Sequence, residues 1–302
     1  MKSLTLKGCG TALLTPFKAD GSVDYEAFAA SVDRQVDAGI HFLVPLGTTG
    51  ETPCLSVEER IELLKIARAR SAGRPVVAGG GTNSPEATVE SMRRLEPHGP
   101  DAFLIVVPYY NKPTQQGMYA YFKAVAAETD LPVIIYNVPG RTGANMLPDT
   151  VIRLAREVPN IRGIKEASGN YGQVSEILRR APEDFTVLSG DDDMTLAFMA
   201  TGAHGVVSVA SNVAPKEVAQ MVEAMQCGDL ATARVLHHRL FPLFKACFAE
   251  SNPIPAKAAL AQLGVIGQQL KIPGDLLLQV VILRLQLFPV EALQSDEAHV
   301  AD

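Results

Sequence analysis

The chain has 302 residues, of which 47% are hydrophobic and 20% are charged, and its formal net charge is −6. This composition excludes a disordered or collagen-like chain, and a mildly acidic chain without a basic block is a poor nucleic-acid binder. Lys7 and Gly8 interrupt the apolar stretch that a signal peptide would need, and residues 276–288 are too short and too polar to span a bilayer. We therefore expect a soluble, cytoplasmic protein.

Short apolar runs rich in β-branched residues recur through the first two thirds of the chain. Continuous runs of this kind are typical of strands buried on both faces of a sheet. They begin near Cys9, Phe42, Pro75, Ala102, Pro132, Ile161, Phe185 and His204. Amphipathic segments separate them and predict helices, one of which opens with a capping-box pattern at Ser56. The other predicted helices cover residues 24–38, 84–95, 115–128, 148–157, 171–180 and 191–201.

Eight strands alternating with helices favour a (β/α)8 TIM barrel of the α/β class. The alternative, an open doubly wound sheet, predicts a glycine-rich turn at the first helix, but the first run continues into TPFKADGS without a GxGxxG motif. The alternation stops near residue 210, and four consecutive helices are predicted over residues 215–226, 230–248, 253–263 and 275–288. We expect a catalytic barrel at 1–228 and a C-terminal helical subdomain at 229–302 that ends in a short acidic tail.

Active sites of such barrels lie at the C-terminal ends of the strands. Of the eleven lysines in the chain, only Lys165 follows a predicted strand in this way. A lysine at the barrel mouth with apolar walls would have a lowered pKa, as a Schiff-base lysine needs. The alternative is a structural lysine paired with a carboxylate.

Three other strand ends carry residues that suit the same chemistry. Tyr136 ends the strand before the lysine strand, where a phenol can shuttle protons, although it could also be a packed rim tyrosine. The Thr48–Thr49 turn offers N–H groups and hydroxyls for a carboxylate, or is simply a tight turn. Arg141 suits bidentate carboxylate binding, or is a surface arginine.

Several other features have simpler explanations than a binding site. The glycines at 79–81 favour a close strand-to-helix turn over a phosphate cradle, and the aspartates at 191–193 favour a helix start over a metal site. His237 and His238 are adjacent in a predicted helix and face different ways. The four cysteines form no CxxC pair. We expect no metal and no cofactor.

Six segments together resemble the pyruvate-dependent class I aldolase family, typified by dihydrodipicolinate synthase and N-acetylneuraminate lyase. They are GTTGE, PYYNKPTQ, IIYNVPGRTG, GIKEASG, LSGDDD and GVVSV, and they occur in the family's order. Within this family, NVPGRTG and the segment ESNPIPAK resemble the synthase branch. The resemblance implies condensation of pyruvate with L-aspartate 4-semialdehyde, a step toward diaminopimelate and lysine.

The resemblance also implies roles for particular residues of this chain. Lys165 would form the imine with pyruvate, and Tyr136 would exchange protons through a relay with Thr48 and Tyr110. The residues implied to bind substrates are Thr49 and Val207 for pyruvate, and Arg141 and Gly190 for the semialdehyde. Tyr110 would come from a neighbouring subunit, so a homodimer or homotetramer is expected.

Two alternative functions stay open at this point. One is another aldolase of the family that acts on a sugar-derived keto acid, and the other is a non-catalytic keto-acid-binding barrel. The resemblance bears on regulation too. Asn83 and Tyr109 match the lysine-binding pocket of lysine-inhibited family members, whereas Val57 and Arg60 stand where those members have histidines. We expect weak or absent feedback inhibition by L-lysine.

Overall fold

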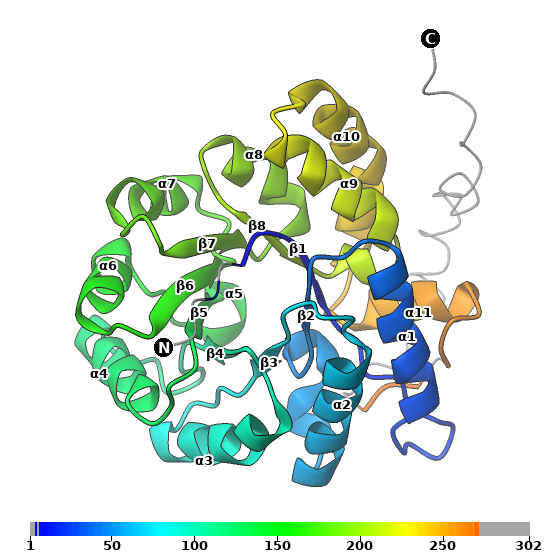
Figure 1. Ribbon diagram of the computed structural model, residues 1–302, viewed down its shortest axis with the longest axis horizontal. Helices are drawn as coiled ribbons and strands as arrows, with labels where there is room; N and C mark the ends of the chain where they lie inside the picture. The colour runs from blue at the N-terminus through cyan, green and yellow to red at the C-terminus, as the bar shows by residue number, and fades with distance from the viewer. Residues whose placement is uncertain (1–3, 5, 268, 272–302) are drawn as a thin grey trace.

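Eight parallel strands close into a barrel in the computed structural model, which describes residues 4, 6–267 and 269–271 (Figure 1). The strand order β2-β1-β8-β7-β6-β5-β4-β3 is completed by a parallel bridge between Leu43 and Val76, which joins β2 to the start of β3. The predicted (β/α)8 architecture is therefore confirmed. The strands are β1 (Gly8–Ala12), β2 (Phe42–Val44), β3 (Val77–Gly79), β4 (Ala102–Val106), β5 (Val133–Asn137), β6 (Ile161–Glu166), β7 (Thr186–Ser189) and β8 (Gly205–Ser208).

Helices surround the barrel and cover the outer face of the sheet (Figure 1). They are α1 (Tyr25–Asp37), α2 (Val57–Arg70), α3 (Pro85–Leu95), α4 (Gln115–Ala126), α5 (Pro139–Thr142), α6 (Pro148–Glu157), α7 (Tyr171–Arg180), α8 (Thr195–Ala200), α9 (Pro215–Gln226), α10 (Leu230–Ala246) and α11 (Ile254–Gln262). The capping box predicted for α2 is present, because Ser56 accepts from the Glu59 N–H and Glu59 accepts from the Ser56 N–H.

Two apolar clusters hold the barrel together. The larger one fills the space between the strands and the helices, and the smaller one fills the barrel interior. Side chains alternate along a strand, so every strand except β6 supplies both clusters. Strand β6 contributes Ile161 and Ile164 to the larger cluster alone. The interior cluster includes Ala12, Phe42, Val44, Val77, Leu104, Ile134, Tyr136, Leu188 and Val207. Tyr136 and Val207 thus share the interior of the barrel near its mouth.

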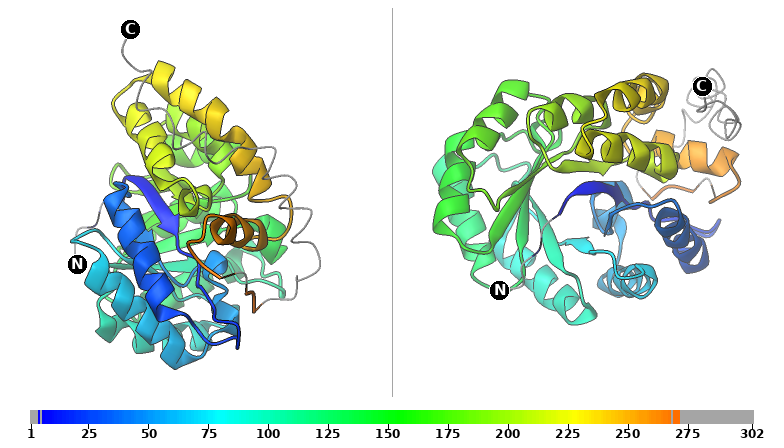
Figure 2. Two further views of the ribbon diagram at one scale, coloured as in Figure 1. Left: turned by 90° about the vertical axis from the view of Figure 1, so that its right-hand side faces the viewer. Right: turned by 45° about the horizontal axis from the view of Figure 1, so that its top comes forward.

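The helices after residue 228 lie against one side of the barrel. Helix α10 packs along α9, and α11 lies between α10 and the β1–α1 side (Figure 2). The helix predicted at 275–288 lies outside the described residues. Within the described part of the chain, no helix is long and apolar enough to cross a membrane.

The structure departs from the sequence prediction in two places near the barrel mouth. The helix expected at 191–201 is split into a 3-10 turn at Asp192–Met194 and the short α8. The cause is the Asp192 carboxylate, which is fully buried and accepts from the Val209 and Ala210 N–H groups at 3.0 Å. Helix α5, which carries Arg141, was not predicted.

Candidate active site

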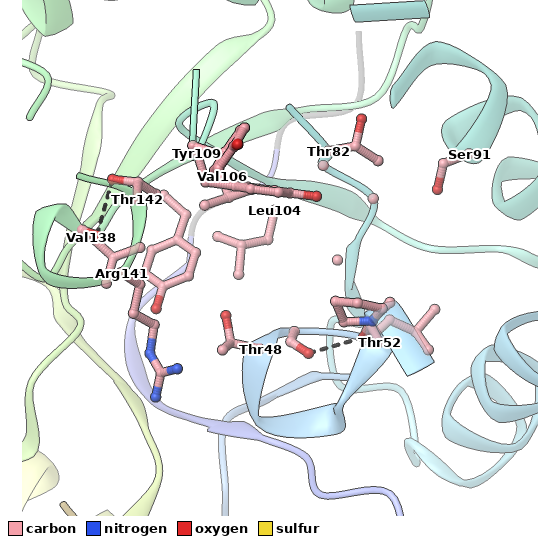
Figure 3. A pocket seen from close by; sticks show the side chains of 18 of the residues that line it. Thr48, Thr52, Thr82, Ser91, Leu104, Val106, Tyr109, Val138, Arg141 and Thr142 are labelled. Carbon is pink, nitrogen blue, oxygen red and sulfur yellow. Dashed lines mark hydrogen bonds between the residues drawn. The ribbon is translucent and has the colours of Figure 1, made fainter. Parts of the chain in front are cut away.

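A cavity of about 1080 Å³ opens at the C-terminal ends of the strands. Four of the eight predicted site residues line it, namely Thr48, Tyr110, Tyr136 and Arg141. Figure 3 shows the Thr48 side chain directed into this space and the Arg141 side chain extending along its edge from α5. The other four residues do not belong to the cavity lining, namely Lys165, Thr49, Val207 and Gly190.

Lys165 and Tyr136 are direct cross-strand neighbours, because β5 and β6 pair them in register. The Lys165 Nζ lies 4.1 Å from the centroid of the Tyr136 ring. Lys165 is only 6% exposed, and no carboxylate within the described residues lies within 4 Å of its Nζ. Lys165 therefore does not form, within the described residues, the lysine–carboxylate ion pair that was the alternative interpretation.

The residue after Lys165 points to the opposite face, as strand alternation predicts. The Glu166 carboxylate is fully buried and accepts hydrogen bonds from Asn137 Nδ2 at 3.0 Å, from Gln173 Nε2 at 3.0 Å and from the Ser168 N–H at 2.9 Å. Burial raises the pKa of Glu166, and these donors oppose that rise. This network joins the ends of β5 and β6 from behind and so fixes the strands that carry Tyr136 and Lys165.

The turn after β2 presents Thr48 and Thr49 on a 3-10 helix, Thr48–Gly50. Its backbone is held by the Thr15 hydroxyl, which donates to the Gly50 carbonyl at 2.8 Å, and by the Thr52 hydroxyl, which donates to the Gly47 carbonyl at 2.9 Å. The Thr48 hydroxyl has no hydrogen-bond partner among the described residues. A threonine hydroxyl without a partner can both donate and accept a hydrogen bond.

Thr49 is almost fully buried, and its Oγ1 accepts a hydrogen bond from Asn252 Nδ2 at 2.8 Å. Because the amide is the donor, the proton of the Thr49 hydroxyl stays available for an anionic ligand. The Asn252 carbonyl in turn accepts from Arg141 Nη2 at 3.1 Å. One residue of the C-terminal segment thus links the threonine turn to the arginine.

The remaining predicted residues differ in their surroundings. Tyr110 is 88% exposed and has a positive φ of 71°, which is uncommon for a bulky side chain. Val207 is buried in the barrel interior with Tyr136. Gly190 donates to the Glu166 carbonyl at 2.7 Å, and a Cβ there would lie 2.6 Å from the Cβ of Ala167, so close packing requires glycine. No hydrogen bond joins Tyr136, Thr48 and Tyr110 in the described residues of this single chain.

The model of the dihydrodipicolinate synthetase family matches residues 5–275 of this chain. A relative named 4-hydroxy-tetrahydrodipicolinate synthase, from Koribacter versatilis, is 50% identical over 272 residues, which cover 89% of this chain and 90% of the relative. The chain belongs to the dihydrodipicolinate synthetase family.

Solved structures of this family have the same fold as the chain. Dihydrodipicolinate synthase from Aquifex aeolicus is 43% identical, with a TM-score of 0.90 over 94% of this chain and 99% of that one. The chloride-inhibited dihydrodipicolinate synthase from Acinetobacter baumannii, complexed with pyruvate, is 38% identical, with a TM-score of 0.88 over 93% of this chain and 98% of that one. The family resemblance inferred from the six sequence segments is thus confirmed.

Sequence reasoning missed Asp191 in this member of the dihydrodipicolinate synthetase family. Burial raises the pKa of Asp191 to about 6, and the positive charge of Lys165 acts in the opposite direction. Asp191 therefore lies within electrostatic reach of the candidate nucleophile. The available signal was its place two residues after the end of β7, which the sequence interpretation assigned to a helix start.

The three consecutive aspartates have three separate surroundings. Asp192 accepts from two backbone N–H groups, and Asp193 pairs with Lys245 Nζ at 3.1 Å. Their carboxylates do not converge, and no group of three or more potential metal ligands occurs in the described part of the chain. The glycine run after β3 serves close packing, because a Cβ on Gly79 would lie 1.9 Å from the Leu46 carbonyl oxygen.

Two further residues beside the threonine turn also escaped the sequence analysis. Asn252 bridges Thr49 and Arg141, and Glu51 forms a buried ion pair with Lys257. Both lie inside the segments GTTGE and ESNPIPAK that carried the family resemblance. Asn252 meets Thr49, and Glu51 meets Lys257, across some two hundred residues of the chain. No local sequence pattern predicts such contacts.

Proposed function

We propose that the chain condenses pyruvate with L-aspartate 4-semialdehyde to 4-hydroxy-tetrahydrodipicolinate. The observation that carries this proposal is the buried Lys165, which contacts the Tyr136 ring at the wall of a cavity with Arg141 at its edge. A shielded amine, a phenol and a guanidinium suit imine chemistry on a keto acid followed by capture of a second carboxylate. The names of the curated relatives support the same activity.

In the first half of the reaction, neutral Lys165 attacks the keto carbon of pyruvate, and loss of water from the carbinolamine gives an iminium. Tyr136 donates and accepts the protons of these steps, with the free Thr48 hydroxyl and Tyr110 as the rest of the relay. Thr49 binds the pyruvate carboxylate through its available hydroxyl proton, and Val207 supplies an apolar contact. The iminium then accepts electrons as a methyl proton leaves, which yields an enamine.

In the second half, the enamine carbon attacks the aldehyde of the semialdehyde. Arg141 binds the carboxylate of this substrate, and Gly190, which has no side chain, leaves room for it. The substrate amine then closes the ring and displaces Lys165, which returns as a free amine. Because the iminium itself is the electron sink, the proposed reaction uses no cofactor or metal.

We propose that Tyr110 acts in the site of a neighbouring subunit, within a homodimer or homotetramer. Its 88% exposure in the single chain supports this arrangement, since the side chain makes little contact within its own subunit. Mixing Tyr110→Phe subunits with Lys165→Ala subunits tests it. A mixed dimer would hold both defects in one site and leave the other intact, so part of the activity should return. No recovery, with subunit exchange verified, would show that the relay is not shared.

One experiment separates the proposed activity from its two alternatives. The protein is reduced with borohydride in the presence of pyruvate, and the labelled peptide is mapped by mass spectrometry, while a coupled assay measures turnover with the semialdehyde. We expect the adduct on Lys165 together with turnover. Adduct formation without turnover would favour an aldolase that acts on a sugar-derived keto acid, and the absence of both would favour a non-catalytic barrel.

A further inference from the structure

The turn that presents Thr48 and Thr49 ends in a residue with an unusual backbone. Glu51 has φ 53° and ψ 33°, which is the left-handed region that side-chain-bearing residues rarely occupy. Such a conformation persists where surrounding contacts fix it. The Glu51 side chain is only 1% exposed and makes contacts of this kind.

Two partners of the Glu51 side chain come from the C-terminal segment. Lys257 Nζ lies 2.5 Å from Glu51 Oε1, and the Lys271 N–H donates to Glu51 Oε2 at 2.8 Å. Lys257 belongs to α11 and is itself 1% exposed. Its Nζ also donates to the Gln269 carbonyl at 3.1 Å and lies 4.1 Å from the centroid of the Phe17 ring. A carboxylate and an ammonium therefore meet in a space closed to solvent, and the carboxylate belongs to the residue that ends the turn.

The ammonium of Lys257 is tied to this place by electrostatics. Burial lowers the pKa of Lys257, whereas the Glu51 carboxylate raises it again. Either charge alone in this space would be strongly unfavourable, so each partner holds the other in position. Glu51 is two residues from Thr49, and a movement of its side chain would therefore be transmitted to the carboxylate-binding turn.

We infer that the buried Glu51–Lys257 pair positions the Thr48–Thr49 turn for pyruvate, an inference that rests on the proposed function. Glu51 and Lys257 are positioning residues, because neither lines the cavity. The pair fixes Glu51 at the end of the turn. The Thr15 hydroxyl holds the turn's backbone, and Asn252 holds the Thr49 hydroxyl. The pair thereby gives the C-terminal helices, the subdomain proposed from the sequence, a part in binding the first substrate.

The double variant Glu51→Gln/Lys257→Met tests the inference without leaving a single buried charge. The fraction of Lys165 trapped by borohydride is measured against pyruvate concentration, and the coupled assay supplies the KM for the semialdehyde. We expect the half-saturating pyruvate concentration to rise at least tenfold, while the KM for the semialdehyde changes less than threefold. The single variant Lys257→Arg keeps the positive charge beside Glu51, so it should retain most of the pyruvate affinity of the unmodified protein.

Lys245→Met is the matched control. Lys245 also joins a C-terminal helix to the barrel, through Asp193 at 3.1 Å, but both side chains of this pair are partly exposed. This variant should bind pyruvate as the unmodified protein does. Circular dichroism verifies that each variant is folded.

Three results would overturn the inference. One is a folded double variant with unchanged pyruvate dependence, and another is an equal rise in both half-saturating concentrations. The third is failure of the double variant and of Lys257→Arg to fold, which would assign the pair to overall stability instead. If the unmodified protein forms no trapped adduct, the proposed function fails and the inference fails with it. If the unmodified protein and the double variant trap pyruvate with the same concentration dependence, the inference is refuted and the proposed function still stands.

Discussion

Lys165 and Lys257 are both almost fully buried, but their surroundings differ. Lys165 lies against the Tyr136 ring, with no carboxylate of the described residues within 4 Å. Lys257 lies against the Phe17 ring and is paired with Glu51 at 2.5 Å. An amine without an ion-pair partner next to a cavity is suited to react, whereas a sealed ion pair is suited to hold a structure.

The largest expected effect of this contrast is on catalysis. Lys165→Ala should reduce kcat/KM by on the order of 10³-fold or more, because no other amine can form the imine at that place. Borohydride reduction with pyruvate should label Lys165 and leave Lys257 unlabelled, as read by peptide mass mapping. A label on Lys257 would abolish the distinction between the two lysines.

Substitution of Lys257 should reduce stability more than substitution of Lys165, the reverse of their expected effects on catalysis. Lys257→Met leaves the Glu51 carboxylate buried without its ammonium partner, so the free energy of unfolding should fall by about 3–5 kcal/mol. Lys165→Met breaks no ion pair and should change it by no more than about 1 kcal/mol. Urea unfolding followed by circular dichroism measures both. Equal losses in the two variants would contradict the assignment of separate roles.

Arg141 connects the two regions, because it lines the cavity and donates to the Asn252 carbonyl. Arg141→Ala should leave trapping of pyruvate on Lys165 intact but cost about 2–4 kcal/mol in kcat/KM for the semialdehyde, since a charge-assisted pair is lost. Arg141→Lys serves as the comparison that keeps the charge without the bidentate geometry. An unchanged response to the semialdehyde would remove Arg141 from the site.

A smaller effect is expected from the titration of Asp191. Burial raises the pKa of Asp191 to about 6, so its carboxyl group is charged above pH 6, where it interacts electrostatically with Lys165, and neutral below. Since the carboxylate favours the iminium, kcat/KM for pyruvate should fall several-fold as pH decreases through 6, and Asp191→Asn should remove that inflection. Because the folded pKa is raised above 3.8, this group lowers stability by roughly 1–3 kcal/mol as pH rises from 4 to 7, and the variant should lose that pH dependence. A variant that keeps both slopes would exclude Asp191 as their source.

The smallest expected effect is that of L-lysine on the rate. Arg60 lines it together with Tyr109, and Val57 is exposed nearby at the start of α2. A positively charged guanidinium repels an ammonium ligand, and valine offers it no acceptor. A titration of the coupled assay with L-lysine should therefore leave the rate nearly unchanged. Strong inhibition at physiological concentrations would show that the lysine-binding pocket lies elsewhere.

The fold was predictable because its signals are local. Continuous apolar runs, the capping box at Ser56 and the alternation of strands with helices depend on neighbours within a few residues. The placement of Lys165 after a strand was equally local, because parallel strands end at one edge of the barrel. The short helix that carries Arg141 and the division of the helix at 191–201 were missed, since tertiary contacts such as those of Asp192 with Val209 and Ala210 determine them.

The sequence by itself thus determined the barrel, the family and the lysine at the strand end. Only the tertiary structure decided which of two buried lysines has a carboxylate partner, and which residues support the threonine turn. Thr49 and Asn252 are 203 positions apart, and Arg141 and Asn252 are 111 apart. Pairings at such separations arise when the closed barrel brings the C-terminal segment back to the β2 turn, and no periodicity or motif within one segment encodes which side chains will meet there.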